Sequence, residues 1–297
     1  DLNPEIQRGY VLNEKGKRMN QPVNIVAKIK GTESKKSLLV FSHYDSALTP
    51  SFGASDAGSG VVTILESLRA FKATGKQPKN DIIILFTDAE EVGLVGAKLF
   101  VREHRWAKDV ALSLNFESRG SGGPSSMIVE TNHGNKNLIK GFKQANPDFP
   151  LASSLLYSVY KMLPNDTDST ILREEGDIDG LFFAFIDDHF DYHTAGDNFE
   201  RMDRNSLEHQ RSYLMPLLAY FADADLSDTG SGAYKASRFM GLDQTGATGA
   251  DFYFKNEDFE AAEERIRRVL HFADQQKNNK IAITALHHLC AAAWEQG

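Results

Sequence analysis

The sequence predicts an α/β fold, a three-layer α/β/α arrangement around a mostly parallel central sheet. Short, continuously apolar segments recur along the chain, and such segments are typical of strands buried on both faces. Between them lie segments whose apolar residues have helical spacing. Because strand and helix alternate, a parallel sheet covered by helices on both sides is the favoured architecture.

The apolar runs and the helical spacing also assign the individual elements. The predicted strands are 24–29, 37–42, 81–87, 110–116, 126–131 and 181–186. The predicted helices are 58–75, 91–104, 135–145 and 203–226, the last with Ser206 as its expected N-cap. Further on, 256–276 and 280–296 are predicted to be amphipathic helices.

The composition changes after residue 226, which predicts three parts. A first domain over 1–226 is followed by a linker rich in Gly, Ser and Thr over 227–250, and then by a helical tail over 251–297. The tail is expected either to mediate oligomerisation or partner binding, or to be foreign to the first domain.

Charge and cysteine content exclude several classes of function. The formal net charge of −8 argues against nucleic acid or an anionic membrane as a partner. A single cysteine, Cys290, rules out an intrachain disulfide and a cysteine-based zinc site. No apolar stretch reaches the roughly 18 residues that span a bilayer. The chain starts without Met, as expected of a trimmed chain or a mature fragment.

Polar residues that suit metal binding follow the predicted strands. Functional groups of doubly wound sheets gather beyond the carboxyl ends of the strands, so these residues are expected to converge on a metal site. Carboxylates with imidazoles suit Zn²⁺, with Mn²⁺ or Co²⁺ as other options. The residues in question are His43, Asp45, Asp56, Glu90, Glu91, Glu117, Tyr192 and His193.

The spacing of these residues suggests how such a site would work. Two ions about 3.5–4 Å apart need a carboxylate between them and suit hydrolysis. In the adjacent pair Glu90-Glu91, one side chain can bind metal while the other acts as a general base. Asp45 lies two residues after His43, so its carboxylate can accept a hydrogen bond from the imidazole and fix the orientation of the ring.

These motifs, in this order, resemble the M28 family of metallopeptidases, and most closely its often membrane-attached branch. The resemblance covers about 20–226 and implies a zinc exopeptidase-like fold. The motifs are "HYD" (43–45), "GASDAGSG" (53–60), "DAEEVGL" (88–94), "NFES" (115–118), "NDTDST" (165–170) and "YHTAGD" (192–197).

The resemblance implies a role for each residue. Asp56 would bridge two zinc ions, with His43 and Glu117 completing one site, and Glu91 and His193 the other. Glu90 would be the general base that activates a metal-bridging water, Asp45 the partner of His43, and Tyr192 the oxyanion donor. The implied activity is that of an aminopeptidase on peptide substrates. The implied location of the full-length protein is exported, periplasmic or membrane-attached.

Two other functions remain open at this point. Glu117 stands where many family aminopeptidases have Asp, and the related glutaminyl cyclases use one zinc, so one ion per chain is an alternative to two. A cyclase would need an apolar pocket with tryptophans, whereas Trp106 and Trp294 lie away from the motifs. A catalytically silent binding module is the other alternative, but such modules typically lose ligand residues.

Each candidate residue also has a purely structural interpretation. Asp56 could cap the helix that starts near residue 58, and Glu90 with Glu91 could be a solvated helix start. Asp88 is expected to be structural and Asp197 to cap a following turn. For Asp166 and Asp168 the expectation is a turn, or a hydrogen bond from one of them to a metal ligand or to the substrate amine. A solvated loop is expected for His189, and a helix surface for His287 and His288.

Overall fold

The computed structural model describes residues 2–13, 17–33, 36–152, 166–227 and 229. The chain divides into two compact units, and the helices and strands named below all lie in the first, Asp1–Asp148 with Asp166–Ala233. The predicted helical tail over 251–297 lies outside the described residues, as does nearly all of the predicted linker over 227–250. The division into a domain over 1–226, a linker and a tail therefore stays a prediction.

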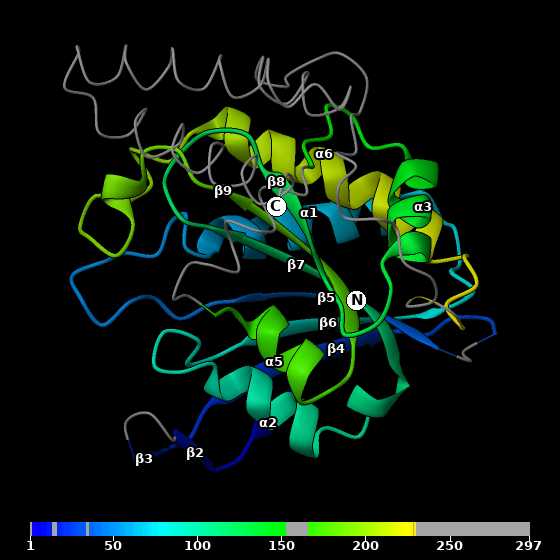
Figure 1. Cartoon of the computed structure of the whole chain (residues 1–297), viewed down its shortest axis with the longest axis horizontal. Helices are drawn as coiled ribbons and strands as arrows, with labels where there is room; N and C mark the ends of the chain where they lie inside the picture. Colours follow the sequence, from blue (N-terminus) through cyan, green and yellow to red (C-terminus); the bar gives the residue numbers. More distant parts are fainter. Residues whose placement is uncertain (1, 14–16, 34–35, 153–165, 228, 230–297) are drawn as a thin grey trace, which may run out of the picture. The chain divides into compact units, whose positions relative to one another are not determined.

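A seven-stranded sheet forms the centre of the first unit, in the order β1-β4-β6-β5-β7-β9-β8 (Figure 1). The four inner strands β6, β5, β7 and β9 are parallel, while β1, β4 and β8 pair antiparallel with their neighbours. The predicted mostly parallel sheet is confirmed. Its strands are β1 (Glu5–Arg8), β4 (Val23–Ile29), β5 (Ser37–His43), β6 (Asp81–Thr87), β7 (Val110–Ser118), β8 (Ser126–Glu130) and β9 (Asp179–Phe185).

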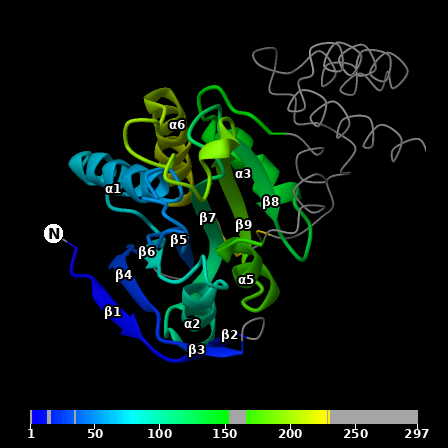
Figure 2. The same cartoon turned by 90° about the vertical axis from the view of Figure 1, so that its left-hand side faces the viewer.

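Helices cover both faces of the sheet, which confirms the three layers (Figures 1 and 2). One face carries α1 (Gly58–Ala73), α3 (Lys136–Ala145) and α6 (Arg204–Phe221), and the other carries α2 (Val95–Glu103) and α5 (Asp168–Glu174). Smaller elements are the hairpin of β2 (Val11–Asn13) and β3 (Arg18–Asn20) and the 3-10 turns η1 (Ala107–Asp109) and η2 (His189–Asp191). Among the described helices, none combines the length and apolarity needed to cross a bilayer.

The sheet holds the helices through apolar side chains on both of its faces. Toward α2 and α5, a buried cluster joins side chains of β5, β6 and both helices, among them Phe41, Leu85, Phe100 and Leu172. Toward α3 and α6, aromatic rings of Phe116, Phe183, Phe142 and Tyr213 pack with centroids 4.9–6.3 Å apart. Burying a side chain of this size contributes roughly 1.5–3 kcal/mol, so these contacts fix the strand ends in space.

Two sequence-based predictions about helix starts are wrong. The helix predicted over 91–104 begins only at Val95, because the backbone turns first: Gly93 N and Leu94 N both donate to Glu90 O, and Leu94 has a left-handed φ of 59°. The N-cap of α6 is Asp203 rather than Ser206, since the Asp203 side chain accepts the Asn205 N–H. Strands β1, β2 and β3 and helix α5 were not predicted.

Gly60 in α1 allows this helix to approach the sheet closely. A Cβ at this position would lie 2.1 Å from the Phe116 carbonyl oxygen and 2.4 Å from Ser42 Oγ. Because backbone of β7 cannot move aside cheaply, Gly60→Ala is expected to lower the free energy of unfolding by about 3 kcal/mol. Chemical denaturation measures this. Leu65→Ala on the exposed side of α1 is the control, with less than about 1 kcal/mol expected. A loss that small for Gly60→Ala would contradict the prediction.

Candidate metal centre

The carboxyl ends of β5, β6 and β7 bring the first candidate residues together. The parallel register pairs Phe41 with Asn115, and His43 and Glu117 follow two residues later on these strands, where the charges of the two side chains interact. Both side chains point to the same face as Phe41, because residues two apart share a face. Both residues are buried, with 1% and 4% of their surface exposed.

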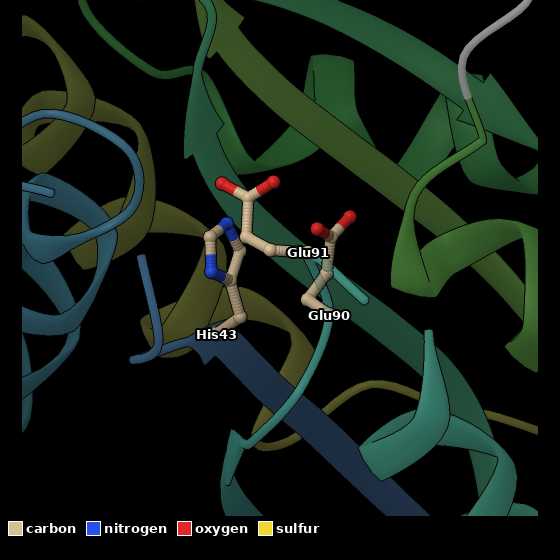
Figure 3. Close-up of side chains that lie close together, drawn as sticks. All are labelled: His43, Glu90 and Glu91. Carbon is tan, nitrogen blue, oxygen red and sulfur yellow. The ribbon is translucent and has the colours of Figure 1, made fainter. Parts of the chain in front are cut away.

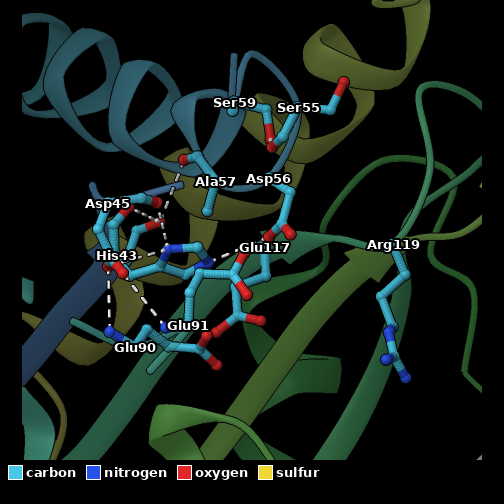
Figure 4. Close-up of polar contacts among 12 residues, drawn as sticks. His43, Asp45, Ser55, Asp56, Ala57, Ser59, Glu90, Glu91, Glu117 and Arg119 are labelled. Atoms are coloured by element: carbon cyan, nitrogen blue, oxygen red, sulfur yellow. Dashed lines mark hydrogen bonds and ion pairs between the residues drawn. The ribbon is translucent and has the colours of Figure 1, made fainter. Parts of the chain in front are cut away.

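Asp56 lies between two imidazoles. Its Oδ1 is 3.0 Å from His43 Nε2 (Figure 4). Its Oδ2 is 3.2 Å from His193 Nε2. His193 Nε2 is also 3.0 Å from Glu91 Oε2. One carboxylate therefore faces two ring nitrogens with its two oxygens, which is the arrangement expected of a bridging ligand.

Two groups of side chains in the described part of the chain have ligand atoms within 4.8 Å of one another. One comprises His43, Glu90 and Glu91 (Figure 3), and the other Asp56, Glu91 and His193. Glu117 belongs to neither group, and its Oε1 accepts a hydrogen bond of 2.8 Å from Asn115 Nδ2. The geometry thus brings together four of the predicted ligands and places the expected base, Glu90, among the possible ligands.

Negative charge is crowded at this site. Burial raises the pKa of Glu90 well above its usual value, and the charges of Glu117, Asp168 and Asp56 add to this rise while His43 opposes it. Burial likewise raises the pKa of Glu117 to about 7, with further rises from Asp56 and Asp168. A bound cation would favour the ionised form of every one of these carboxylates.

Asp45 lies beside His43 but contacts it mainly through its backbone. His43 Nδ1 lies 3.0 Å from the Asp45 carbonyl oxygen and 3.5 Å from Oδ1. A carbonyl only accepts, so Nδ1 carries a proton, and Nε2, 3.0 Å from Asp56 Oδ1, is the ring nitrogen that a metal ion would bind. The Asp45 carboxylate instead accepts the backbone N–H groups of Glu90 (3.1 Å) and Glu91 (3.2 Å).

Tyr192 stacks on the ring of His193 with centroids 3.7 Å apart. Arg119 lies over the Tyr192 ring at 5.1 Å and donates from Nη2 to the phenol oxygen at 3.5 Å. Burial and the charge of Asp56 raise the pKa of Tyr192, while Arg119 opposes the rise. The phenol is therefore protonated near neutral pH and can donate a hydrogen bond.

Two further aspartates lie at the site in ways that the sequence did not predict. Asp197 does not cap a following turn: its carboxylate accepts the backbone N–H of Ser55 (2.6 Å) and of Asp56 (3.2 Å). Asp168 is 1% exposed, and its Oδ2 accepts the Thr87 hydroxyl. The sequence signal for both was their place in the ordered motifs, since Asp168 lies in "NDTDST" and Asp197 in "YHTAGD".

The structural interpretations of the candidate ligands are not supported. Helix α1 starts from Ala57 without a side-chain cap, so Asp56 is not a helix cap. The Glu91 side chain is only 7% exposed, which rules out a solvated helix start. Asp88 is structural as expected, because its Oδ2 accepts the Val23 N–H.

Unpartnered buried atoms test whether the residues fit a metal. In the described part of the chain, Glu91 Oε1 and Asp168 Oδ1 are buried without a hydrogen bond. Such atoms are costly unless another ligand satisfies them. Two imidazole nitrogens and several carboxylate oxygens are a donor set that zinc accepts, so the residues fit a zinc site.

The sequence profile of peptidase family M28 matches residues 24–218. The chain belongs to this family. A vacuolar membrane protease of Candida dubliniensis is 32% identical over 222 residues, which are 73% of this chain and 23% of that protein. The chain thus spans less than a quarter of the length of this relative. The recognition of an M28 member from its ordered motifs is confirmed.

Solved structures of two enzymes share the fold. A glutaminyl cyclase from Porphyromonas gingivalis superposes with a TM-score of 0.55 at 18% identity, covering 73% of this chain and 84% of that one. A zinc aminopeptidase from Bacillus subtilis gives 0.53 at 20% identity, covering 73% and 54%. At these identities the likeness shows the fold, and the predicted zinc exopeptidase-like architecture is confirmed.

Proposed function

We propose that the M28 chain is a zinc-dependent exopeptidase, and specifically an aminopeptidase. The observation that carries the proposal is the position of Asp56, whose two carboxylate oxygens face His43 Nε2 and His193 Nε2 at 3.0 and 3.2 Å. Family membership and the names of its relatives as proteases support a peptide hydrolase. The named aminopeptidase among the structures with this fold supports the narrower activity.

In this proposal the residues would hold two zinc ions. Asp56 is shared, His43 and Glu117 complete one site, and Glu91 and His193 complete the other. Asp45 supports both halves, because its carbonyl orients His43 and its carboxylate fixes the backbone of the Glu90-Glu91 turn. The unpartnered Glu91 Oε1 is the atom that most needs an added ligand.

The remaining residues carry out proton transfer and stabilise charge. Zinc, when bound, polarises a carbonyl and lowers the pKa of water toward about 7. Glu90 takes a proton from the attacking water and returns it to the departing amine. The protonated Tyr192 donates to the oxyanion that develops on the carbonyl oxygen. Arg119 donates to the Tyr192 oxygen, so the phenol proton stays available for the substrate.

The charge of the site supports removal of N-terminal residues. The acidic side chains carry more negative charge than two Zn²⁺ ions would neutralise. A protonated α-amine on the substrate would therefore complement the charge that remains. A peptide whose N-terminus is blocked lacks this positive charge. The acidic side chains are Asp45, Asp56, Glu90, Glu91, Glu117 and Asp168.

The cyclase alternative finds less support. Trp106 lies before η1, at the amino end of β7, whereas the candidate site lies beyond its carboxyl end. Trp294 lies outside the described residues. For the full-length protein, the name of the vacuolar membrane relative supports a membrane-associated location.

Zinc content and substrate choice test the proposal together. Elemental analysis is expected to find about two zinc ions per chain. Aminoacyl-p-nitroanilides should be cleaved, a phenanthroline chelator should abolish the cleavage, and added zinc should restore it. The matched control is the N-acetylated substrate, which should be cleaved at least about 100-fold more slowly. A chain without zinc, even when zinc is supplied, would contradict the proposal and favour the silent binding module.

A further inference from the structure

Two aspartates outside the candidate ligand groups hold ligand-bearing backbone in the same way. Asp45 accepts two consecutive N–H groups, Glu90 at 3.1 Å and Glu91 at 3.2 Å. Asp197 also accepts two consecutive N–H groups, Ser55 at 2.6 Å and Asp56 at 3.2 Å. Each carboxylate thereby fixes the main chain at a residue that supplies a metal-facing oxygen.

We propose that Asp197 is a positioning residue that orients Asp56 for zinc binding, an inference that rests on the proposed function. Asp56 must direct one oxygen to each imidazole, so a small rotation of its backbone would lose one of the two contacts. Asp197 is 1% exposed, and a carboxylate buried to this extent needs charge-assisted hydrogen bonds. The two backbone N–H groups supply them.

Asp197 also joins the two loops that meet at the site. Asp56 lies in the loop between β5 and α1, whereas Asp197 lies in the "YHTAGD" segment that supplies His193. A second contact links the same loops, since Thr49 Oγ1 donates to the His193 carbonyl at 2.7 Å. The bridging carboxylate and the His193 imidazole are thereby held at a fixed separation.

Zinc affinity separates a positioning role from a merely structural one. Asp197→Asn keeps the shape but offers one acceptor oxygen, so one N–H group would face an amide donor. The variant is expected to bind zinc about 10- to 100-fold more weakly in a competition titration with a chromogenic chelator. At saturating zinc, kcat should fall more than KM rises.

Asp203→Asn is the matched control. Asp203 also accepts a backbone N–H group, that of Asn205 at 2.9 Å, together with the Ser206 hydroxyl at 3.1 Å, but it holds no ligand-bearing backbone. This variant should bind zinc with wild-type affinity.

The outcomes distinguish the two proposals. Wild-type zinc affinity in Asp197→Asn, beside a zinc-binding wild type, would overturn the positioning role and leave the proposed function intact. A wild type that binds no zinc in the same titration would overturn both. If Asp197→Asn does not fold, Asp197→Glu decides: its carboxylate is displaced by one methylene in a buried site, so at least about threefold weaker zinc binding is expected. Unchanged affinity in that variant would overturn the inference.

Discussion

Replacing Glu90 with Gln is expected to lower kcat about 10³-fold and to leave zinc content unchanged. General acid–base catalysis contributes a factor of this size, and an amide cannot accept the proton that the carboxylate takes from water. The backbone turn should stay in place, because it is the N–H of Glu90, and not its side chain, that Asp45 holds. Steady-state kinetics at saturating zinc, together with elemental analysis, measures both quantities.

The neighbouring glutamates are matched controls for this variant. Glu91→Gln should lose zinc, because Glu91 Oε2 lies 3.0 Å from His193 Nε2 and its Oε1 is buried without a partner. Glu117→Gln should also lose zinc if Glu117 is a ligand. This comparison is needed because the possible ligand atoms of Glu90 and His43 lie close together, whereas Glu117 accepts a hydrogen bond from Asn115. Loss of zinc in Glu90→Gln with retention in Glu117→Gln would exchange the roles of these two residues.

The inner sheet was predictable because its strands are buried on both faces. β5, β6 and β9 have no partly exposed residue, so their sequences read as continuous apolar runs. The edge strand β1 has the sequence Glu-Ile-Gln-Arg, with Ile6 and Arg8 exposed, and no such pattern marks it. α5 has only seven residues, too few for helical spacing to be recognised.

The candidate site was predictable where a residue follows a strand, and less so where two loops meet. The parallel register of β5 and β7 brings the strand ends that carry His43 and Glu117 to the same edge of the sheet. The bonds of Asp45 and Asp197 depend on loops that are distant in sequence; the contact between Asp197 and Asp56 joins residues 141 positions apart. Local sequence shows an aspartate near a ligand, and a turn or a cap is the simplest local explanation for it.

Asp56→Asn is expected to have the largest effect on metal binding. Asparagine has one acceptor oxygen and no charge, so it can neither face both imidazoles nor offset the repulsion between two cations. Zinc content should fall from about two ions per chain to less than one, and activity should fall at least about 10⁴-fold, more than for Glu90→Gln, because without zinc the water is no longer activated and the substrate carbonyl is no longer polarised.

Asp88→Asn is the matched control for that loss, since it makes the same chemical change at another aspartate near the site. The Asp88 side chain accepts the Val23 N–H at 2.8 Å, a bond that the amide oxygen of asparagine can replace. This variant should keep both zinc ions and wild-type kcat. Circular dichroism must show both variants folded. Two zinc ions per chain in a folded Asp56→Asn would mean that Asp56 bridges nothing, and another carboxylate, with Glu91 the first candidate, would have to lie between the ions.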